Sequence, residues 1–290
     1  MTLSRLTPAA ELADLYAGWL CDVWGVLHNG VAAFPAAVDA LCRYRAGGGR
    51  VILITNAPRQ SSEVLPQLAQ LGVPDEAFDM TVTSGDVTRK LVEARPDAPL
   101  YHLGPARDNA MLRGLKNPMV GLEEAEICLL TGAVNDETET AEDYDGQLST
   151  MLANKVPIIC ANPDLVVRRG DRLIICAGAI AQRYDEMGGE VVIAGKPRAP
   201  IYEAAMAEMS RLLGRPVEKN ELLAVGDGLP TDVRGGADNG FDVYFLTAGI
   251  HEKELGPMSG PDGPAKVARK VEEQFPGISL AGICDELRWT

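Results

Sequence analysis

The stretch that decides the fold is LLAVGDGLPTD, residues 222–232. Its first four residues are apolar, which is typical of a strand buried on both faces of a parallel sheet. A glycine follows, and then two acids, Asp227 and Asp232, stand on either side of a turn. Carboxylate oxygens suit Mg²⁺, so we expect Asp227 to bind the ion and Asp232 to orient its water molecules or a nearby lysine from a second shell. The alternative is a helix capped by Thr231, with Asp232 near its positive end.

Apolar runs of the same kind recur along the chain and alternate with amphipathic segments. Besides 222–225, they predict buried parallel strands at 19–23, 51–55, 127–130, 158–160, 173–176, 191–194 and 243–246. Helices are expected to begin at the proline pairs Thr7-Pro8, Phe34-Pro35 and Ala199-Pro200. This alternation predicts an α/β fold with a doubly wound parallel sheet, a Rossmann-like core.

The polar motifs suggest how the chain divides into domains. The strongest of them follow strands near residues 22, 55, 196 and 227, and the stretch between the second and third carries none of comparable strength. We therefore expect a core domain made of residues 1–85 and 191–290, with a smaller α/β cap domain inserted at 86–190. Open sheets bind ligands at the carboxyl ends of their strands, and the cap is expected to cover that edge.

Two further motifs place polar groups at strand ends. Asp22 follows a short apolar run, where a carboxylate can bind Mg²⁺ and attack phosphorus, or can simply be a turn acid. Thr55 and Asn56 follow another strand and could hold phosphate oxygens. An ordinary turn in which Asn56 bonds its own backbone explains that pair equally well.

The fourth motif is VVIAGKP, residues 191–197, in which Lys196 comes directly after an apolar run. A lysine there offers a point charge for phosphate and for a nucleophile. Surface lysines are common, so this motif by itself is weak.

Composition narrows the class of partner. The formal net charge is -14, which disfavours binding to nucleic acid or to an anionic membrane, and no apolar run of signal-peptide length opens the chain. We expect a cytoplasmic protein that attracts a small phosphorylated metabolite locally. The six cysteines are scattered without a C-x-x-C pair, which favours buried free thiols over a zinc or disulfide site.

Taken together in order, the four motifs resemble those of the haloacid dehalogenase-like superfamily over essentially the whole chain. The spacing between Thr55 and Lys196 is similar to that of its class IIA branch, which carries a large α/β cap of the C2 type and includes nucleotide, sugar-phosphate and p-nitrophenyl phosphate phosphatases. Asn162-Pro163-Asp164 resembles the cap loop that contacts substrate in that branch.

The resemblance implies a role for each motif. Asp22 would be the nucleophile, and Lys196 would neutralise charge. Thr55 and Asn56 would hold the phosphoryl group, and Asn162 and Asp164 would contact the substrate. Mg²⁺ would be bound by Asp22, Asp227 and the backbone carbonyl of Trp24. Asp232 would not bind the ion directly but would orient its water molecules or the lysine.

Trp24 departs from the family pattern, because phosphatases of the superfamily usually carry a second aspartate there as general acid and base. The indole side chain has no titratable carboxyl and cannot replace that acid. The backbone carbonyl of Trp24 can still bind a metal. Losing a positioned acid commonly costs about 10²- to 10⁴-fold in rate. His28 is either a substitute proton shuttle or, as we favour, a solvated loop histidine. For the indole itself we favour packing against the cap over stacking on a ligand.

The sequence therefore predicts a slow Mg²⁺-dependent phosphatase that forms an aspartyl-phosphate on Asp22. The alternative is a weak or inactive protein that binds or senses a phosphorylated metabolite. A homodimer is left open, as are contributions to substrate binding from Arg59 and Arg168, for which surface ion pairs are at least as good an explanation.

Overall fold

The computed structural model describes residues 5–169, 172–248 and 262–290. The chain folds as two compact units. Unit 1 takes in the described residues of Met1–Thr55, Leu65–Val82 and Pro197–Thr290, and unit 2 those of Asn56–Val64 and Thr83–Lys196. Each unit has a parallel sheet, so the predicted α/β fold class is confirmed.

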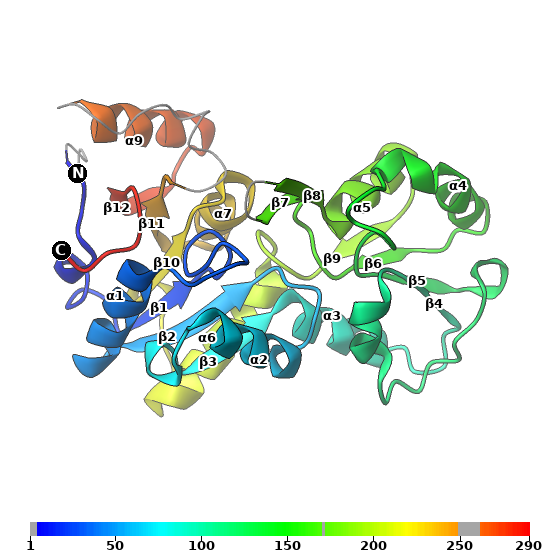
Figure 1. Ribbon diagram of the computed structural model, residues 1–290, viewed down its shortest axis with the longest axis horizontal. Helices are drawn as coiled ribbons and strands as arrows, with labels where there is room; N and C mark the ends of the chain where they lie inside the picture. Colours follow the sequence, from blue (N-terminus) through cyan, green and yellow to red (C-terminus); the bar gives the residue numbers. More distant parts are fainter. Residues whose placement is uncertain (1–4, 170–171, 249–261) are drawn as a thin grey trace. The chain divides into compact units, whose positions relative to one another are not determined.

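Unit 1 is built on a six-stranded sheet in the order β12-β11-β10-β1-β2-β3 (Figure 1). The strands are β1 (Gly18–Cys21), β2 (Arg50–Thr55), β3 (Met80–Thr83), β10 (Leu222–Gly226), β11 (Asp242–Leu246) and β12 (Ser279–Cys284). The pairings from β2 across to β12 are parallel. Both β1 and β10 are buried along their whole length, as their apolar sequences predict.

The helices that accompany this sheet are α1 (Pro35–Ala46), α2 (Ser61–Leu71), α6 (Ala199–Leu213), α7 (Arg234–Asn239) and α9 (Gly263–Gln274). The predicted starts of α1 and α6 are confirmed, with proline in the first turn of each. At Thr7-Pro8 the chain forms only a 3₁₀ turn, Ala9–Glu11, instead of the expected helix. Trp19 of β1 stacks on Tyr44 of α1 with ring centroids 3.9 Å apart, which anchors that helix to the sheet.

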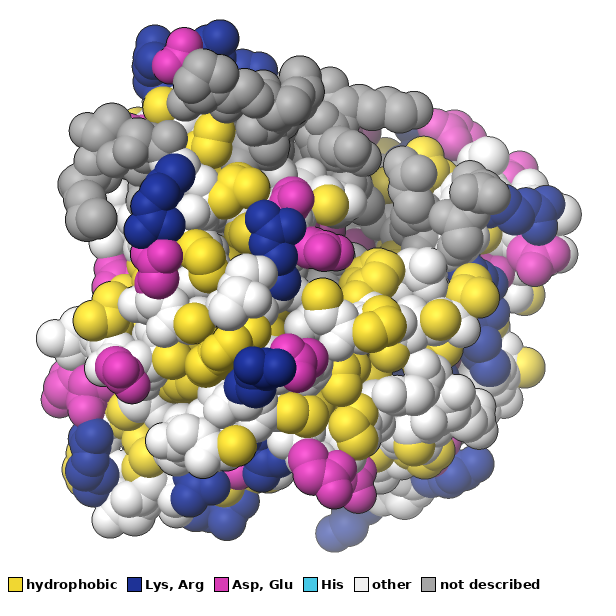
Figure 2. Space-filling view, turned by 60° about the vertical axis from the view of Figure 1, so that its left-hand side comes forward, with side chains coloured by type: hydrophobic (Ala, Val, Ile, Leu, Met, Phe, Trp, Pro, Cys, Tyr) yellow, Lys and Arg dark blue, Asp and Glu magenta, His cyan; other side chains and the backbone are white. Residues whose placement is uncertain are grey.

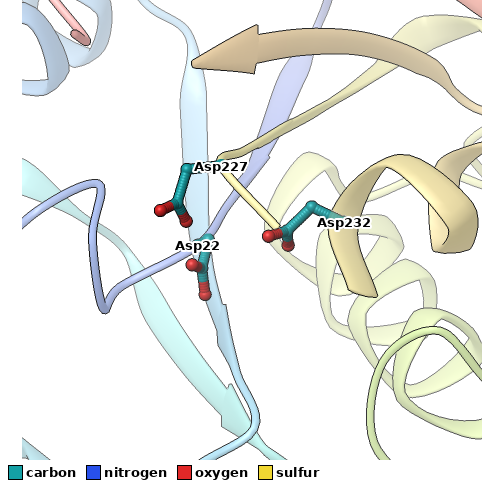
Figure 3. A group of neighbouring side chains, drawn as sticks. All are labelled: Asp22, Asp227 and Asp232. Atoms are coloured by element: carbon teal, nitrogen blue, oxygen red, sulfur yellow. The ribbon is translucent and has the colours of Figure 1, made fainter. Parts of the chain in front are cut away.

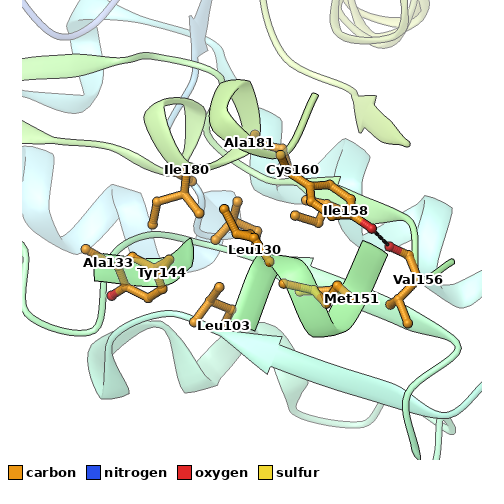
Figure 4. Packing of buried hydrophobic residues seen from close by; sticks show 14 of the residues in the cluster. Leu103, Leu130, Ala133, Tyr144, Met151, Val156, Ile158, Cys160, Ile180 and Ala181 are labelled. Atoms are coloured by element: carbon orange, nitrogen blue, oxygen red, sulfur yellow. Dashed lines mark hydrogen bonds between the residues drawn. The ribbon is translucent and has the colours of Figure 1, made fainter. Parts of the chain in front are cut away.

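Unit 2 has its own four-stranded parallel sheet, in the order β4-β5-β6-β9 (Figure 1). The strands are β4 (Leu100–Leu103), β5 (Ile127–Leu130), β6 (Ile158–Cys160) and β9 (Val191–Ile193), and the helices are α3 (Ser84–Glu93), α4 (Asp145–Ala153) and α5 (Ala177–Glu186). Its core includes Leu130, Tyr144, Met151 and Ile180 (Figure 4). The Tyr184 hydroxyl donates to the carbonyl of Val156 at 2.8 Å, so its polar end is satisfied inside the core.

Three features differ from the sequence prediction. The apolar run at 173–176 is no buried parallel strand: β8 (Arg172–Ile175) pairs antiparallel with β7 (Val166–Arg169) as a hairpin, and its first two residues are exposed. Strand β9, which the sequence prediction groups with the core domain, pairs with β6 in the second sheet. The strands β3, β4, β7 and β12 are absent from the prediction, because β3 and β4 mix in polar residues and β7 and β12 are partly exposed.

All six cysteines are free thiols, as predicted, and all but Cys42 are buried. Among the described residues, no helix is both long and apolar enough to cross a membrane. On the face shown in Figure 2, Lys and Arg side chains are scattered among acidic and apolar ones. That face offers no continuous basic surface of the kind that binds nucleic acid, as far as its described residues go.

Candidate metal and phosphate site

Three aspartates converge at the carboxyl ends of β1 and β10. These strands are adjacent and parallel, with Cys21 opposite Val225, so the residues that follow them lie side by side. Asp22 and Asp227 are those residues, and Asp232 comes from the π-helical turn Leu229–Val233. One carboxylate oxygen from each lies within 4.8 Å of the other two (Figure 3).

The cluster is buried, since Asp22 is 7% exposed and the other two aspartates are each 5% exposed. Three buried carboxylates repel one another unless a cation or protons neutralise them. Oxygen donors at this spacing are the set that a hard divalent ion such as Mg²⁺ prefers. The site therefore fits the predicted metal.

The turn itself orients Asp232. Its Oδ2 accepts the backbone N–H of Gly228 at 3.0 Å. Thr231 lies inside the π-helical turn and donates its hydroxyl to the same oxygen at a long 3.5 Å. The simpler alternative, in which Thr231 caps a helix, is therefore not what the chain forms.

Two glycines let the loops approach this closely. Gly25 has φ +87°, and a Cβ there would collide with the Asp227 carboxylate. A Cβ at Gly226 would collide with the Asp232 carboxyl group. Side chains at these positions would push the aspartates out of place.

Trp24 packs on its own loop. Its ring meets His28 edge-on with centroids 5.0 Å apart, and a Cβ at Gly30 would come within 2.6 Å of the indole. The loop is closed by the backbone bond from Gly25 N–H to the His28 carbonyl at 2.9 Å. Packing of the indole against the cap stays a prediction.

His28 is buried at 2% exposure, so the interpretation as a solvated loop histidine is wrong. Its Nδ1 accepts the N–H of Gly30 at 3.0 Å, which places the ring proton on Nε2. Burial lowers the pKa of His28 to about 4. A proton shuttle near neutral pH needs a pKa near 7, and the burial of His28 disfavours that role.

The remaining predicted phosphate-site residues are also buried. Thr55 ends β2 and is 5% exposed, while Asn56 and Lys196 are 3% and 2% exposed. The Asn56 side chain bonds to the backbone of Lys196 and to the carboxylate of Asp164, all within unit 2. An Asn56 that bonds only its own turn is thus not observed.

The cap loop is a compact turn. The Asn162 side-chain oxygen accepts the N–H of Asp164 at 3.0 Å, and this hydrogen bond stabilises the turn. Arg59 lies 3.9 Å from the buried Asp108, between Nε and Oδ1. The side chain of Arg168 falls outside the described residues.

A polar cluster that the sequence analysis missed lies at the ends of β4 and β5. His102 Nε2 is 2.9 Å from Thr131 Oγ1, and burial lowers the pKa of His102. Asp108 is 1% exposed, and its Oδ1 has no hydrogen-bond partner among the described residues. Burial raises the pKa of this carboxyl. The sequence could have pointed to Asp108, because the segment GPARD, residues 104–108, places a glycine turn and an acid directly after β4.

Comparison with known proteins identifies the family of this chain. A family profile described as haloacid dehalogenase-like hydrolase matches residues 19–116, and a second, HAD-hydrolase-like, matches residues 193–274. The crystal structure of a haloacid dehalogenase-like hydrolase from Brucella suis is 46% identical, with a TM-score of 0.82 over 84% of this chain and 94% of that one.

Curated relatives are named as phosphatases. The 5'-nucleotidase YutF of Bacillus subtilis is 26% identical over 82% of this chain and 90% of its own length. The ribonucleotide monophosphatase NagD of Escherichia coli is 25% identical over 80% of this chain and 87% of its own. With a 46% identical relative matched over nearly its whole length, this chain belongs to the haloacid dehalogenase-like hydrolase family, among relatives that are phosphatases.

Proposed function

We propose that this protein is a Mg²⁺-dependent phosphatase of a small phosphorylated metabolite, acting through an aspartyl-phosphate on Asp22. The observation that carries the proposal is the cluster of Asp22, Asp227 and Asp232, with oxygens within 4.8 Å of one another. A bound Mg²⁺ would neutralise these buried carboxylates, and Mg²⁺ is the ion that commonly assists phosphoryl transfer. Relatives named as phosphatases support the same class of reaction.

In this mechanism an oxygen of Asp22 attacks phosphorus and forms a P–O bond. The bond from phosphorus to the ester oxygen breaks, and the leaving oxygen keeps the electron pair and takes a proton from water. A second water then attacks phosphorus, which releases phosphate and restores the Asp22 carboxylate. Mg²⁺ held by Asp22, Asp227 and the Trp24 carbonyl would supply positive charge for the phosphoryl oxygens.

The other predicted residues take supporting roles. The Thr55 hydroxyl holds a phosphoryl oxygen, and the Lys196 ammonium balances the negative charge that develops. Asp232 would orient water bound to the metal. The cap, which we identify with unit 2, contributes the Asn162-Pro163-Asp164 loop to substrate binding.

Phosphate release from p-nitrophenyl phosphate, sugar phosphates and nucleotides, with and without Mg²⁺, tests this function. We expect slow, metal-dependent release that Asp22→Asn abolishes. Asp238→Asn is a matched control, because Asp238 pairs with Arg234 at 2.7 Å on the surface. Release that persists undiminished in Asp22→Asn would rule out Asp22 as the nucleophile.

A binding protein without turnover is the second candidate. One observation supports it: His28, close to Trp24 in the same loop, is buried with a lowered pKa, so it is a poor substitute for the general acid that we infer to be missing at Trp24. Such a protein would gain thermal stability from a phosphorylated ligand and release no phosphate. Thermal shift on the same panel separates the two functions.

A further inference from the structure

We propose that Asn56 and Asp164 are positioning residues: Asp164 fixes the side chain of Asn56, which in turn holds the backbone of Lys196 where its ammonium serves phosphoryl transfer. This inference rests on the proposed function for its catalytic consequence, but the network itself is a property of unit 2 alone. It gives Asn56 and Asp164 a task other than direct contact with the substrate.

The hydrogen bonds of Asn56 carry the argument. Its Oδ1 accepts the Lys196 N–H at 2.8 Å, and its Nδ2 donates to the Lys196 carbonyl at 3.2 Å. The same Nδ2 donates to Asp164 Oδ1 at 2.8 Å. A side-chain amide has two N–H donors and one carbonyl, so both amide hydrogens are engaged. The side chain of Asn56 has no hydrogen left to donate to a phosphate.

The chemistry of the partners also fixes which way the amide points. Lys196 N–H can only donate, so it needs the amide oxygen, whereas the Asp164 carboxylate only accepts and needs the amide nitrogen. A flipped Asn56 would break all three bonds. Asp164 thus selects the one orientation in which Asn56 pairs with both backbone groups of Lys196.

Close packing of the backbone supports this arrangement. A Cβ on Gly195 would come within 2.6 Å of Asn56 Oδ1 and of Ser84 Oγ, so only glycine lets the chain before Lys196 approach the amide. Asn56 and Lys196 are 3% and 2% exposed. Water therefore has little access to replace a lost bond, and truncation of Asn56 would remove two hydrogen bonds from the buried backbone of Lys196.

The loop that presents Asp164 is itself held firmly. The Asp164 N–H bonds to Asn162 Oδ1 at 3.0 Å, and the Cys160 thiol donates to the Asn162 carbonyl at 3.3 Å. A Cβ on Gly178, in the first turn of α5, would lie 2.5 Å from the Asp164 carbonyl. The loop therefore packs directly against the first turn of α5, and these contacts fix the position of the backbone that carries the Asp164 carboxylate.

Three variants separate positioning from substrate contact. Asp164→Ala removes the acceptor, and we expect kcat to fall by about 10-fold or more with little change in KM, because charge-assisted bonds are strong and small displacements of catalytic groups are costly. Asp164→Asn keeps an acceptor oxygen and should lose clearly less kcat than Asp164→Ala. Asn56→Asp removes both donors and sets a second carboxylate against Asp164, so we expect a loss of about 100-fold or more.

The decisive measurement is kcat and KM for each variant with p-nitrophenyl phosphate, a sugar phosphate and a nucleotide. A positioning role acts on the phosphoryl end and predicts the same fractional loss of kcat with all three substrates. Losses confined to one substrate, or expressed mainly in KM, would overturn the proposal and make Asp164 a substrate contact. Asp145→Ala serves as the control, because Asp145 pairs with Arg183 at 2.5 Å on the surface of the same unit.

Amide hydrogen exchange at Lys196 tests the network without any activity. We expect exchange at least about 10-fold faster in Asn56→Ala and Asp164→Ala than in the wild type, with Asp164→Asn close to the wild type. Unchanged exchange in Asp164→Ala would overturn the proposal. If the wild-type protein releases no phosphate yet shows this exchange pattern, the proposed function fails and the network stands.

Discussion

At the scale of single residues, the proposed function makes Trp24 the residue that limits the rate. The family resemblance places a general acid at this position, and the ring of Trp24 lies against His28 and Gly30. In the proposed mechanism, the proton for the leaving group therefore comes from water. The arrangement of Asp22, Asp227 and Asp232 is untouched by this replacement, so binding and charge balance are separable from proton transfer.

Trp24→Asp should raise the rate of phosphate release by about 10- to 100-fold, because it restores a positioned carboxyl. The measurement is kcat with p-nitrophenyl phosphate in Mg²⁺. Trp24→Phe is the control, since it keeps an aromatic ring without a carboxyl, and it should give no rise. An unchanged rate in Trp24→Asp would show that the missing acid is not the main defect.

His102 should make the protein less stable in mild acid. Burial lowers its folded-state pKa below the ordinary 6.5, so the unfolded chain binds the proton more tightly. The stability that the neutral ring contributes is present above about pH 6.5 and is lost as pH falls through the lower folded-state pKa. Urea unfolding at about pH 7.5 and about pH 5.5 measures this loss. His102→Gln should lose less stability over that interval, and an equal loss would argue against the assignment.

At the scale of elements, helix α3 shows how a side chain fixes where a helix begins. The Thr83 hydroxyl accepts the Asp86 N–H at 2.9 Å, and the Asp86 carboxylate accepts the N–H of Thr83 at 3.3 Å. Asp86 also accepts the N–H of Ser61 at 3.1 Å, which joins the first turns of α2 and α3. This reciprocal capping box satisfies donors that a helix start leaves open.

Two threonines of this region offer a matched pair of substitutions. Thr83→Val keeps the shape but loses the cap, and should lower the free energy of unfolding by about 1 kcal/mol. Thr88 is fully buried in α3, and its Oγ1 has no hydrogen-bond partner among the described residues, so Thr88→Val should be neutral or stabilising. Chemical denaturation measures both. Equal losses in the two variants would mean that the cap contributes nothing specific.

The elements also show where sequence patterns succeed. Helices α1 and α6 each have a proline in the first turn, Pro35 and Pro200, and are followed by Gly47 and Gly214, because these signals act through local backbone geometry. The sequence identifies β9 as a strand but groups it with the wrong sheet. An apolar run of this kind can pair with either sheet, and only contact with β6 decides between them.

At the scale of the whole molecule, metal binding should stabilise the fold. Because the folded chain holds the three carboxylates close together, Mg²⁺ should bind the folded state far better than the unfolded chain. At one hundred times the Kd, binding should add about 2.7 kcal/mol to the free energy of unfolding and raise the midpoint of thermal unfolding by several degrees. EDTA should reverse the shift, and Asp227→Asn should abolish it. Asp238→Asn should respond like the wild type. If Mg²⁺ leaves the midpoint of thermal unfolding of the wild-type protein unchanged, the metal assignment is contradicted.

The fold class, the family and the convergence of Asp22 with Asp227 and Asp232 could all be predicted from the order of the residues. Parallel strands that end in acids bring those acids to one edge, and that relation follows from topology alone. Tertiary structure decided the burial of His28, the placement of β9 and the hydrogen bonds of Asn56 with Asp164 and Lys196. Asn56 lies 108 residues from Asp164 and 140 from Lys196, so no local pattern can report their contact. Burial and long-range hydrogen bonding arise only when the chain has packed, which is why the sequence predicts separate roles for Asn56, Asp164 and Lys196 and does not show that they are bonded to one another.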